Sequence, residues 1–225
     1  MNRLNQKATD TSLYQIFERI NTGGRSLTPQ EIRNCIYQGK FNDLLKKLNE
    51  NIYWRKLYLE DSLDDRMKDI EFVLRFFALS NKNLLKKEIT QISLKKELNL
   101  YMKKMNEEDI SSKEEEFNKT FKFIYENLNN EAFRNFVKNK DGTFKDFETL
   151  SEKFHPTIFD AISIATLYAL RSNPNIEIKD LKERRVNLLK NKDFINYTNI
   201  RTTNLENIIG RIKLALKELF GIEYE

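Results

Sequence analysis

The sequence contains only one cysteine and one histidine among 225 residues. A single cysteine, Cys35, excludes a disulfide within the chain and fits a reducing cytoplasm. Because Cys35 lies between Ile32 and Ile36 on an expected helix, we predict a packed core thiol and not a nucleophile. The single histidine, His155, excludes Ser-His-Asp and HNH chemistry and a His-based zinc site within this chain. Proline follows His155 and favours an extended conformation at a helix entrance, so we assign this residue a structural role.

Long apolar runs, glycine and proline are also scarce. No apolar run approaches the length of a membrane-spanning helix, and the N-terminus lacks the apolar core of a signal peptide. We therefore expect a soluble, cytoplasmic protein that does not contact a membrane. Only six glycines and three prolines occur, which favours long helices with few tight turns. The sequence shows neither a strand-like alternation of period two nor an internal repeat of about 20–50 residues.

Apolar residues recur every three or four positions over most of the sequence. This pattern predicts an all-α fold, an irregular multi-helix bundle of about eight to ten helices. A polar connection at 106–112 divides the chain into two helical subdomains, 1–105 and 106–225, which we expect to pack as one continuous domain. Trp54 is expected to anchor the core. The expected helices cover residues 12–21, 28–38, 41–48, 51–58, 62–80, 83–104, 113–128, 131–138, 157–170, 177–191 and 203–220.

Charged residues make up 32% of the chain and leave a formal net charge of +5. Lysine and glutamate mostly interleave, as they do on solvated helix faces. The positive surplus is compatible with a polyanionic partner but is too small to require one. It is also uneven, since residues 1–40 hold six Lys/Arg against three Asp/Glu. A second basic segment contains Arg184 and Arg185, for which a solvated helix face is the simpler interpretation.

A glycine turn between two expected helices is the most informative local pattern. Gly23 and Gly24 are adjacent, and such a pair supplies positive φ angles and leaves backbone N–H groups uncovered. Thr28 then acts as a helix N-cap, with proline at the first helical position and Glu31 placed to close a capping box. An anion is expected at such a helix N-terminus beside Arg25. A helix corner without any ligand needs the same residues, and Glu31 would then occupy the backbone N–H of Thr28.

The sequence around this turn resembles a known family. Residues 16–34 (IFERINTGGRSLTPQEIRN) and 37–41 (YQGKF) are similar to the second half of the N-terminal domain of GmrSD-type restriction endonucleases. This ParB/sulfiredoxin-like family carries, in a β-rich first half, a DGQQR motif associated with nucleotide hydrolysis or DNA cleavage. The present sequence has no such motif. The resemblance continues at lower density through residues 65–69, 74–76, 132–134, 158–162 and 210–212.

The resemblance implies that the chain is the helical half of a two-part domain in a DNA-defence protein that restricts modified phage DNA. This half would contribute to a nucleotide or DNA-phosphate site without catalysing a reaction alone. We expect no catalytic residue and no metal ligand here, whereas an NTP and a divalent metal would bind together with the β-rich half. The implied phosphate-binding residues are Arg19, Asn21, Gly23, Gly24, Arg25, Thr28 and Arg33, with Glu31, Arg66 and Asp69 in support.

Arg66 has two competing interpretations. A local ion pair with Asp69 at i+3 is the simpler one. The family resemblance instead directs Arg66 toward the glycine turn. Glu31 and Asp69 likewise have structural explanations that involve no ligand.

Two other functions remain open. One is a non-enzymatic module that binds DNA or a protein, in which the basic N-terminal region and the Arg184–Arg185 helix contact phosphates. The other is an inactive, truncated remnant. Its first helix would expose an apolar face and promote self-association. The resemblance itself favours a β-rich, DGQQR-containing chain as partner. The apolar face of the first helix consists of Leu13, Ile16, Phe17 and Ile20.

Overall fold

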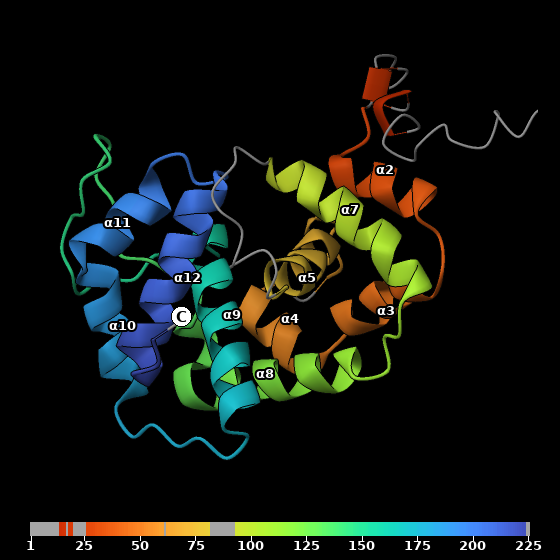
Figure 1. Ribbon diagram of the computed structural model, residues 1–225. Helices are drawn as coiled ribbons and strands as arrows, with labels where there is room; N and C mark the ends of the chain where they lie inside the picture. The colour runs from red at the N-terminus through yellow and green to blue at the C-terminus, as the bar shows by residue number, and fades with distance from the viewer. Residues whose placement is uncertain (1–13, 17, 20–25, 61, 82–92, 224–225) are drawn as a thin grey trace, which may run out of the picture.

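The structure is a computed structural model of the chain, and it describes residues 14–16, 18–19, 26–60, 62–81 and 93–223 (Figure 1). In this part of the chain it contains ten α-helices and one 3-10 helix, and its only β-type pairs are isolated bridges. The all-α prediction is therefore confirmed. None of the helices among these residues is long and apolar enough to cross a membrane.

The described helices fall into two groups along the chain. The first group is α2 (Pro29–Ile36), α3 (Lys40–Asn49), α4 (Ile52–Tyr58), α5 (Lys68–Leu79) and α7 (Leu94–Glu107). The second group is α8 (Lys113–Leu128), the 3-10 helix (Asn129–Glu131), α9 (Pro156–Ser172), α10 (Leu181–Lys190), α11 (Lys192–Asn199) and α12 (Leu205–Phe220).

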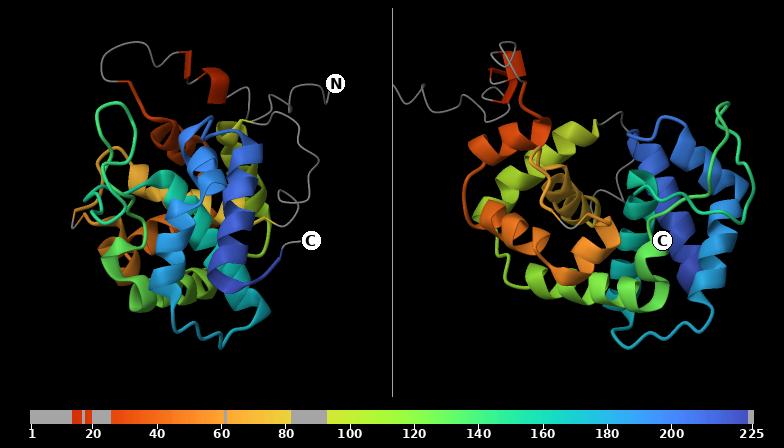
Figure 2. Two further views of the ribbon diagram at one scale, coloured as in Figure 1. Left: turned by 90° about the vertical axis from the view of Figure 1, so that its left-hand side faces the viewer. Right: turned by 180° about the vertical axis from the view of Figure 1, so that it is seen from behind.

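Helix α9 occupies the middle of the molecule (Figures 1 and 2). It packs along α12 on one side and against α5 on the other, and it also contacts α8. Helices α10 and α11 flank α12, while α2, α3 and α7 surround α5 (Figure 1). Helix α8 runs along the base of the molecule and contacts α3 and α4 as well as α9 and α10.

The central position of α9 follows from its composition, because every residue from 158 to 169 is buried. Most of these residues are apolar, and the serine and threonine hydroxyl groups among them bond within the helix. Ser163 Oγ donates to the carbonyl of Phe159 at 2.6 Å, and Thr166 Oγ1 donates to that of Ile162 at 2.7 Å. These polar groups therefore enter the core without losing their hydrogen bonds. Two residues bond outside the helix instead. The Tyr168 hydroxyl donates to the carbonyl of Ser80 at 3.0 Å, and the partners of Asp160 come from other helices.

One hydrophobic cluster runs through residues of both expected subdomains, so the division near residue 105 stays a prediction. Trp54 lies inside this cluster with no exposed surface, which confirms its expected role in the core. Its indole Nε1 donates to Asn49 Oδ1 at 2.9 Å, so burial leaves no polar group unpaired. Four rings have centroids 5.0–6.0 Å from that of the indole: Tyr58, Phe121, Phe154 and Phe159.

Helix α5 starts later than the predicted range 62–80. Met67 has φ of 56°, in the left-handed region, and this conformation precludes a helix that runs through it. The carboxylate of Asp69 accepts the backbone N–H of Asp64 at 3.0 Å, which holds the preceding residues in a turn. Leu63, which the helical range 62–80 included, lies before α5 and is 54% exposed.

The helix predicted at 131–138 is wrong. The structure describes these residues, and they form no α-helix. Phe136 pairs with Leu150, and Lys138 pairs with Phe144, in isolated antiparallel bridges. The ring of Phe136 also lies edge-on to that of Phe144 with a centroid distance of 6.2 Å. Aromatic residues that contact one another across two extended segments favour this arrangement over a helix.

Helix α11 was not predicted, because its eight residues give too short an apolar pattern. Its start is nevertheless well capped, since the side chain of Asn191 accepts the N–H groups of Asp193 and Phe194 at 2.9 and 3.2 Å. The other expected helices are present with shifted ends. Only the last part of the helix expected at 83–104 belongs to the described residues, where it forms α7.

Two burial assignments from the sequence are wrong. Cys35 is exposed, because α2 turns Ile32 and Arg33 toward the interior and Cys35 away from it. Arg185 is buried, and it donates hydrogen bonds to backbone carbonyls instead of facing solvent. In the first expected helix, Tyr14 is buried, and Ile16, a member of its apolar face, is 49% exposed. Leu13, Phe17 and Ile20 of that helix lie outside the described residues.

Candidate functional site

The centre of the predicted turn site lies outside the described residues. Asn21, Gly23, Gly24 and Arg25 belong to that part of the chain. Arg19 is exposed in a short helical piece. The remaining members of the predicted site can be placed, and they occupy several distinct environments.

The N-terminus of α2 carries the predicted capping box. Thr28 Oγ1 accepts the N–H of Glu31 at 3.2 Å, and the Glu31 carboxylate accepts the N–H of Thr28 at 2.5 Å. Partial burial favours a raised pKa for Glu31, but the hydrogen bonds from Thr28 and the charge of Arg66 outweigh it and lower the pKa below its usual value. A carboxylate of the chain itself therefore occupies the place where an anion was expected.

The side chain of Arg66, which precedes α5, extends toward α2. Its Nη2 lies 3.2 Å from the Glu31 carboxylate and donates to the carbonyl of Ser26 at 2.6 Å. Thr28 Oγ1 in turn donates to the backbone carbonyl of Arg66 at 3.1 Å. The alternative local pair with Asp69 is wrong, because the buried Asp69 carboxylate is occupied elsewhere. It accepts hydrogen bonds from Asn49 and Arg55, both at 2.8 Å.

Arg33 is 1% exposed, so it is not a free surface cation. Its Nε donates to Asn99 Oδ1 at 2.8 Å, and its Nη1 contacts both Gln30 and the Glu71 carboxylate at 2.9 Å. The Glu71 carboxylate balances its charge at close range. Arg33 lines a large pocket, but because the Glu71 carboxylate neutralises its guanidinium group, it adds no net positive charge to that pocket.

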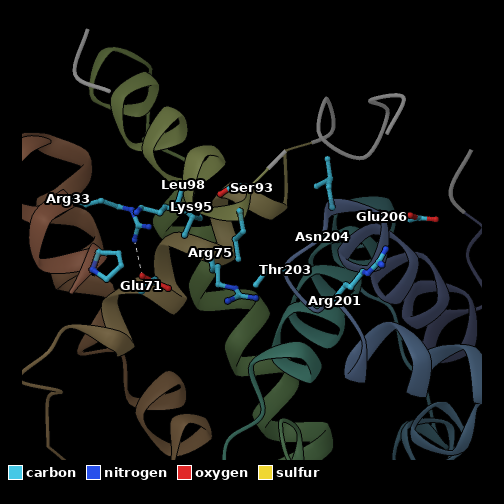
Figure 3. A pocket seen from close by; sticks show the side chains of 13 residues that line it. Arg33, Glu71, Arg75, Ser93, Lys95, Leu98, Arg201, Thr203, Asn204 and Glu206 are labelled. Carbon is cyan, nitrogen blue, oxygen red and sulfur yellow. Dashed lines mark hydrogen bonds and ion pairs between the residues drawn. The ribbon is translucent and has the colours of Figure 1, made fainter. Parts of the chain in front are cut away.

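A large pocket lies where the helices of the two halves of the chain meet (Figure 3). Its volume is about 890 Å³, within the range of small-molecule sites. Arg33, Arg75 and Lys95 come from the first half, whereas Arg201 and Asn204 come from the second (Figure 3). We call it the junction pocket. Its lining consists of Pro29, Arg33, Glu71, Arg75, Ser93, Leu94, Lys95, Leu98, Arg201, Thr203, Asn204, Leu205 and Glu206.

Two helix N-termini lie side by side at the junction pocket. Ser93 is the N-cap of α7 and Asn204 is the N-cap of α12, and an isolated antiparallel bridge pairs these two residues. Neither side chain accepts a hydrogen bond from its own helix. Each N-terminus carries a positive end of the helix dipole, equivalent to about half an elementary charge. The pocket is thus lined by the positive ends of two helix dipoles. It is also lined by two polar side chains, Ser93 and Asn204, that accept no hydrogen bond from their own helices.

Arg75, which lines the pocket, belongs to a buried cluster of three charged residues. Arg75 donates to both oxygens of Asp160, from Nε at 2.8 Å and from Nη2 at 2.5 Å. Arg211 also donates to Asp160 through Nη2. Two guanidinium groups therefore share one carboxylate, which leaves one positive charge uncompensated among these residues. Burial outweighs the attraction of Asp160 and lowers the pKa of Arg211, as expected for a cation that lacks a full counter-charge.

Arg75 is the member of this cluster that lines the pocket, so the uncompensated positive charge lies at the pocket through its guanidinium group. It is 8% exposed, and no hydrogen bond of its Nη1 occurs among the described residues. Arg201 also lines the pocket and is exposed, in a left-handed conformation with φ of 42°. No ion pair of Arg201 or of Glu206 is found in the part of the chain that the structure describes. Lys95, in contrast, pairs with Glu18.

The sequence did not single out the residues of the junction pocket, apart from Arg33. Ser93 and Asn204 had one usable signal, because each is a preferred N-cap residue directly before an apolar helical pattern. Arg75, Arg211 and their shared partner Asp160 lie in three separate segments of the family resemblance, but no local pattern indicated that their side chains meet. Among the described residues, no group of three or more histidine, cysteine, aspartate or glutamate side chains could hold a metal ion. The arrangement is suited to hold an anion.

No family model, no curated protein and no solved structure matches this chain.

Proposed function

We propose that this chain binds a phosphate-bearing ligand, a nucleotide or a nucleic acid, in the junction pocket. It does so as the helical portion of a DNA-defence protein related to the GmrSD-type restriction endonucleases, and it does not catalyse a reaction alone. The observation that carries the proposal is the positive charge of Arg75 at a pocket lined by the N-termini of α7 and α12. Phosphate groups bind at sites of this composition because helix N-termini and guanidinium groups both donate N–H bonds to anions.

The family resemblance supports the relation to DNA defence through the same residues. Arg75, Asp160 and Arg211 belong to three of the short segments on which the resemblance rests, 74–76, 158–162 and 210–212. These segments are far apart in the sequence, yet the three side chains form one cluster in the fold. The resemblance also implies a β-rich, DGQQR-containing partner that would hold the NTP and the metal.

The alternative of a surface phosphate contact through the Arg184–Arg185 helix is weaker. Arg185 is buried and its guanidinium donates to backbone carbonyls. Arg184 forms a local ion pair with Asp180 at 3.0 Å. Neither arginine is therefore free to contact a nucleic acid in the way that the sequence suggested.

The substitution Asn204→Asp tests the proposal without disturbing α12. It places a carboxylate in the pocket, and aspartate is as good an N-cap as asparagine. We expect binding of a fluorescent ATP analogue and of a labelled single-stranded oligonucleotide to weaken on the order of tenfold, while the melting temperature is unchanged or raised. Binding by the wild type should also fall as salt concentration rises.

Asn191→Asp is the matched control. It makes the same change of charge at the N-cap of α11, and Asn191 does not line the pocket. We expect it to leave the affinity unchanged, because salt screens charges beyond about 8 Å at physiological ionic strength. Equal weakening by both substitutions would mean that overall charge and not the junction pocket governs binding. Absence of binding to either ligand by the wild-type chain would refute the proposed function.

A further inference from the structure

We infer that the junction pocket selects a phosphate monoester over a bridging phosphodiester. This inference rests on the proposed function and adds to it the chemical form of the phosphate. A monoester occurs on a mononucleotide and at the end of a nucleic-acid strand, whereas a diester occurs within a strand. The charge, the hydrogen-bond donors and the lining of the pocket all favour the monoester.

The charge of the pocket matches a dianion. Arg33 is balanced by Glu71, and Lys95 is balanced by the nearby Glu18. Arg201 and Glu206 contribute one charge of each sign. The cluster of Arg75, Asp160 and Arg211 adds one positive charge, and the two helix N-termini add about half a charge each. A phosphate monoester carries about −1.5 to −2 at neutral pH, whereas a diester carries a single negative charge.

The donors of the pocket are sufficient for a group with three terminal oxygens. Arg75 supplies the Nη1 group, which has no hydrogen bond among the described residues. The Ser93 hydroxyl and the Asn204 amide come from adjacent N-caps, and neither caps its own helix. Thr203 adds a second hydroxyl group to the lining. A diester has only two terminal oxygens and would leave part of this set unpaired, which is costly in a partly buried site.

The lining also indicates how the rest of the ligand is bound. Its apolar members, such as Leu94, Leu98 and Leu205, are aliphatic, and none of the described lining residues is aromatic. Stacking of bases on aromatic rings is the usual source of affinity for the interior of a single strand. The described lining of the pocket offers no aromatic ring for such stacking. Recognition therefore depends on the phosphate, and a volume of about 890 Å³ accommodates a nucleotide or a strand end.

Isothermal titration of the full chain with two pairs of probes tests the inference. The first pair is adenosine 5′-monophosphate and its methyl ester, which is a diester with the same nucleoside. We expect the monoester to bind on the order of tenfold more tightly. The second pair is a short single-stranded oligonucleotide with and without a 5′-phosphate. A preference within this second pair identifies a strand end as a source of the monoester, and a preference in the first pair alone identifies a mononucleotide.

The pH dependence gives an independent readout. The preference for the monoester should shrink between about pH 7.5 and about pH 5, because the second pKa of the phosphate lies near 6. The acids that face the pocket are Glu71 and Glu206, and their cationic neighbours are Arg33, Arg75, Lys95 and Arg201. Protonation of either acid would strengthen binding of any anion, whereas protonation of the phosphate weakens binding of the monoester. The first effect applies equally to both probes of a pair, so it does not change the preference between them.

Asn204→Asp should reduce the preference for the monoester to less than about threefold, and Asn191→Asp should leave it as in the wild type. Equal affinities for the monophosphate and its methyl ester in the wild type would overturn the inference while leaving the proposed function intact. Absence of binding to all four probes would overturn both.

Discussion

Arg75 and Asp160 form a two-pronged ion pair that joins α5 to α9 across the core, with Nε–Oδ1 and Nη2–Oδ2 distances of 2.8 and 2.5 Å. Arg211 of α12 donates to the same carboxylate, and its Nη1 donates to the carbonyl of Thr202 at 2.8 Å. The pair therefore supports the residues before α12 as well as the interior. Because Arg201, Thr203 and Asn204 line the junction pocket, the buried cluster determines the shape of one of its walls.

Removal of the shared carboxylate should strongly destabilise the protein. Asp160→Asn leaves two buried guanidinium groups without a counter-charge, which costs about 3–5 kcal/mol. Urea unfolding followed by circular dichroism measures this loss. Asp180→Asn is the control, because Asp180 pairs with Arg184 at the surface and such a pair contributes about 0–1 kcal/mol. Similar losses in the two variants would show that the buried cluster is not important for stability.

The adjacent arginines 184 and 185 should differ in their effect on stability. Arg185 donates to the carbonyls of Ala132 and Arg134 at 3.1 and 2.6 Å, and burial lowers its pKa to about 10. We expect Arg185→Met to lower the free energy of unfolding by about 2–3 kcal/mol, because it leaves buried carbonyls unpaired. Arg184→Met should cost less than about 1 kcal/mol. The reverse order in a chemical denaturation series would contradict the burial described above.

His155 should make the protein sensitive to mild acid. Burial, together with the charges of Lys138, Lys153 and Arg185, lowers the pKa of His155 below its usual value of about 6.5. The unfolded chain therefore binds this proton more readily than the folded chain does. The contribution of His155 is fully present above about pH 6.5 and is lost as the pH falls toward the lower folded pKa, by at most about 1.4 kcal/mol per pH unit.

His155→Gln tests this linkage. The urea midpoint of the wild type should fall more steeply than that of the variant between about pH 6.5 and about pH 5. The two curves should run parallel above that range. Parallel curves over the whole interval would mean that His155 has the same proton affinity in the folded and unfolded states.

Gly210 should tolerate no larger residue while Tyr197 is present. A Cβ atom at position 210 would lie 2.7 Å from Cζ of the Tyr197 ring, so that the ring or the packing of α11 against α12 would have to shift. We expect Gly210→Ala to cost about 1–3 kcal/mol. The cost should be smaller in a Tyr197→Ala background, as a double-mutant cycle with thermal unfolding would show. An equal cost in both backgrounds would exclude the ring as its cause.

Much of the fold could be predicted because its strongest signals are local. The pattern of apolar residues in α8, α9 and α12 identified these helices, and Gly221 ends the last of them in a left-handed conformation. The capping box of Thr28 and Glu31 is also confirmed. Predictions were wrong where a remote contact determines the local structure. Asp69 reaches back to hold the turn before α5, and Phe136 pairs with an extended segment that follows it.

The candidate site could be predicted less well. The sequence drew attention to the N-terminus of α2, but Glu31 and Arg66 already occupy that position. The N-termini of α7 and α12 are more open to a ligand, and they meet only because the two halves of the chain fold together. The charge imbalance of Arg75, Asp160 and Arg211 likewise arises from three separate helices. No local pattern contains such information.

The single tryptophan provides an optical reporter of core integrity. Trp54 is surrounded by aromatic side chains from α4, α8 and α9 and from the segment before α9, so its emission depends on whether these elements remain in contact. Water entry at any of them would shift the fluorescence maximum to longer wavelength. Every substitution discussed above can thus be followed in the unlabelled chain.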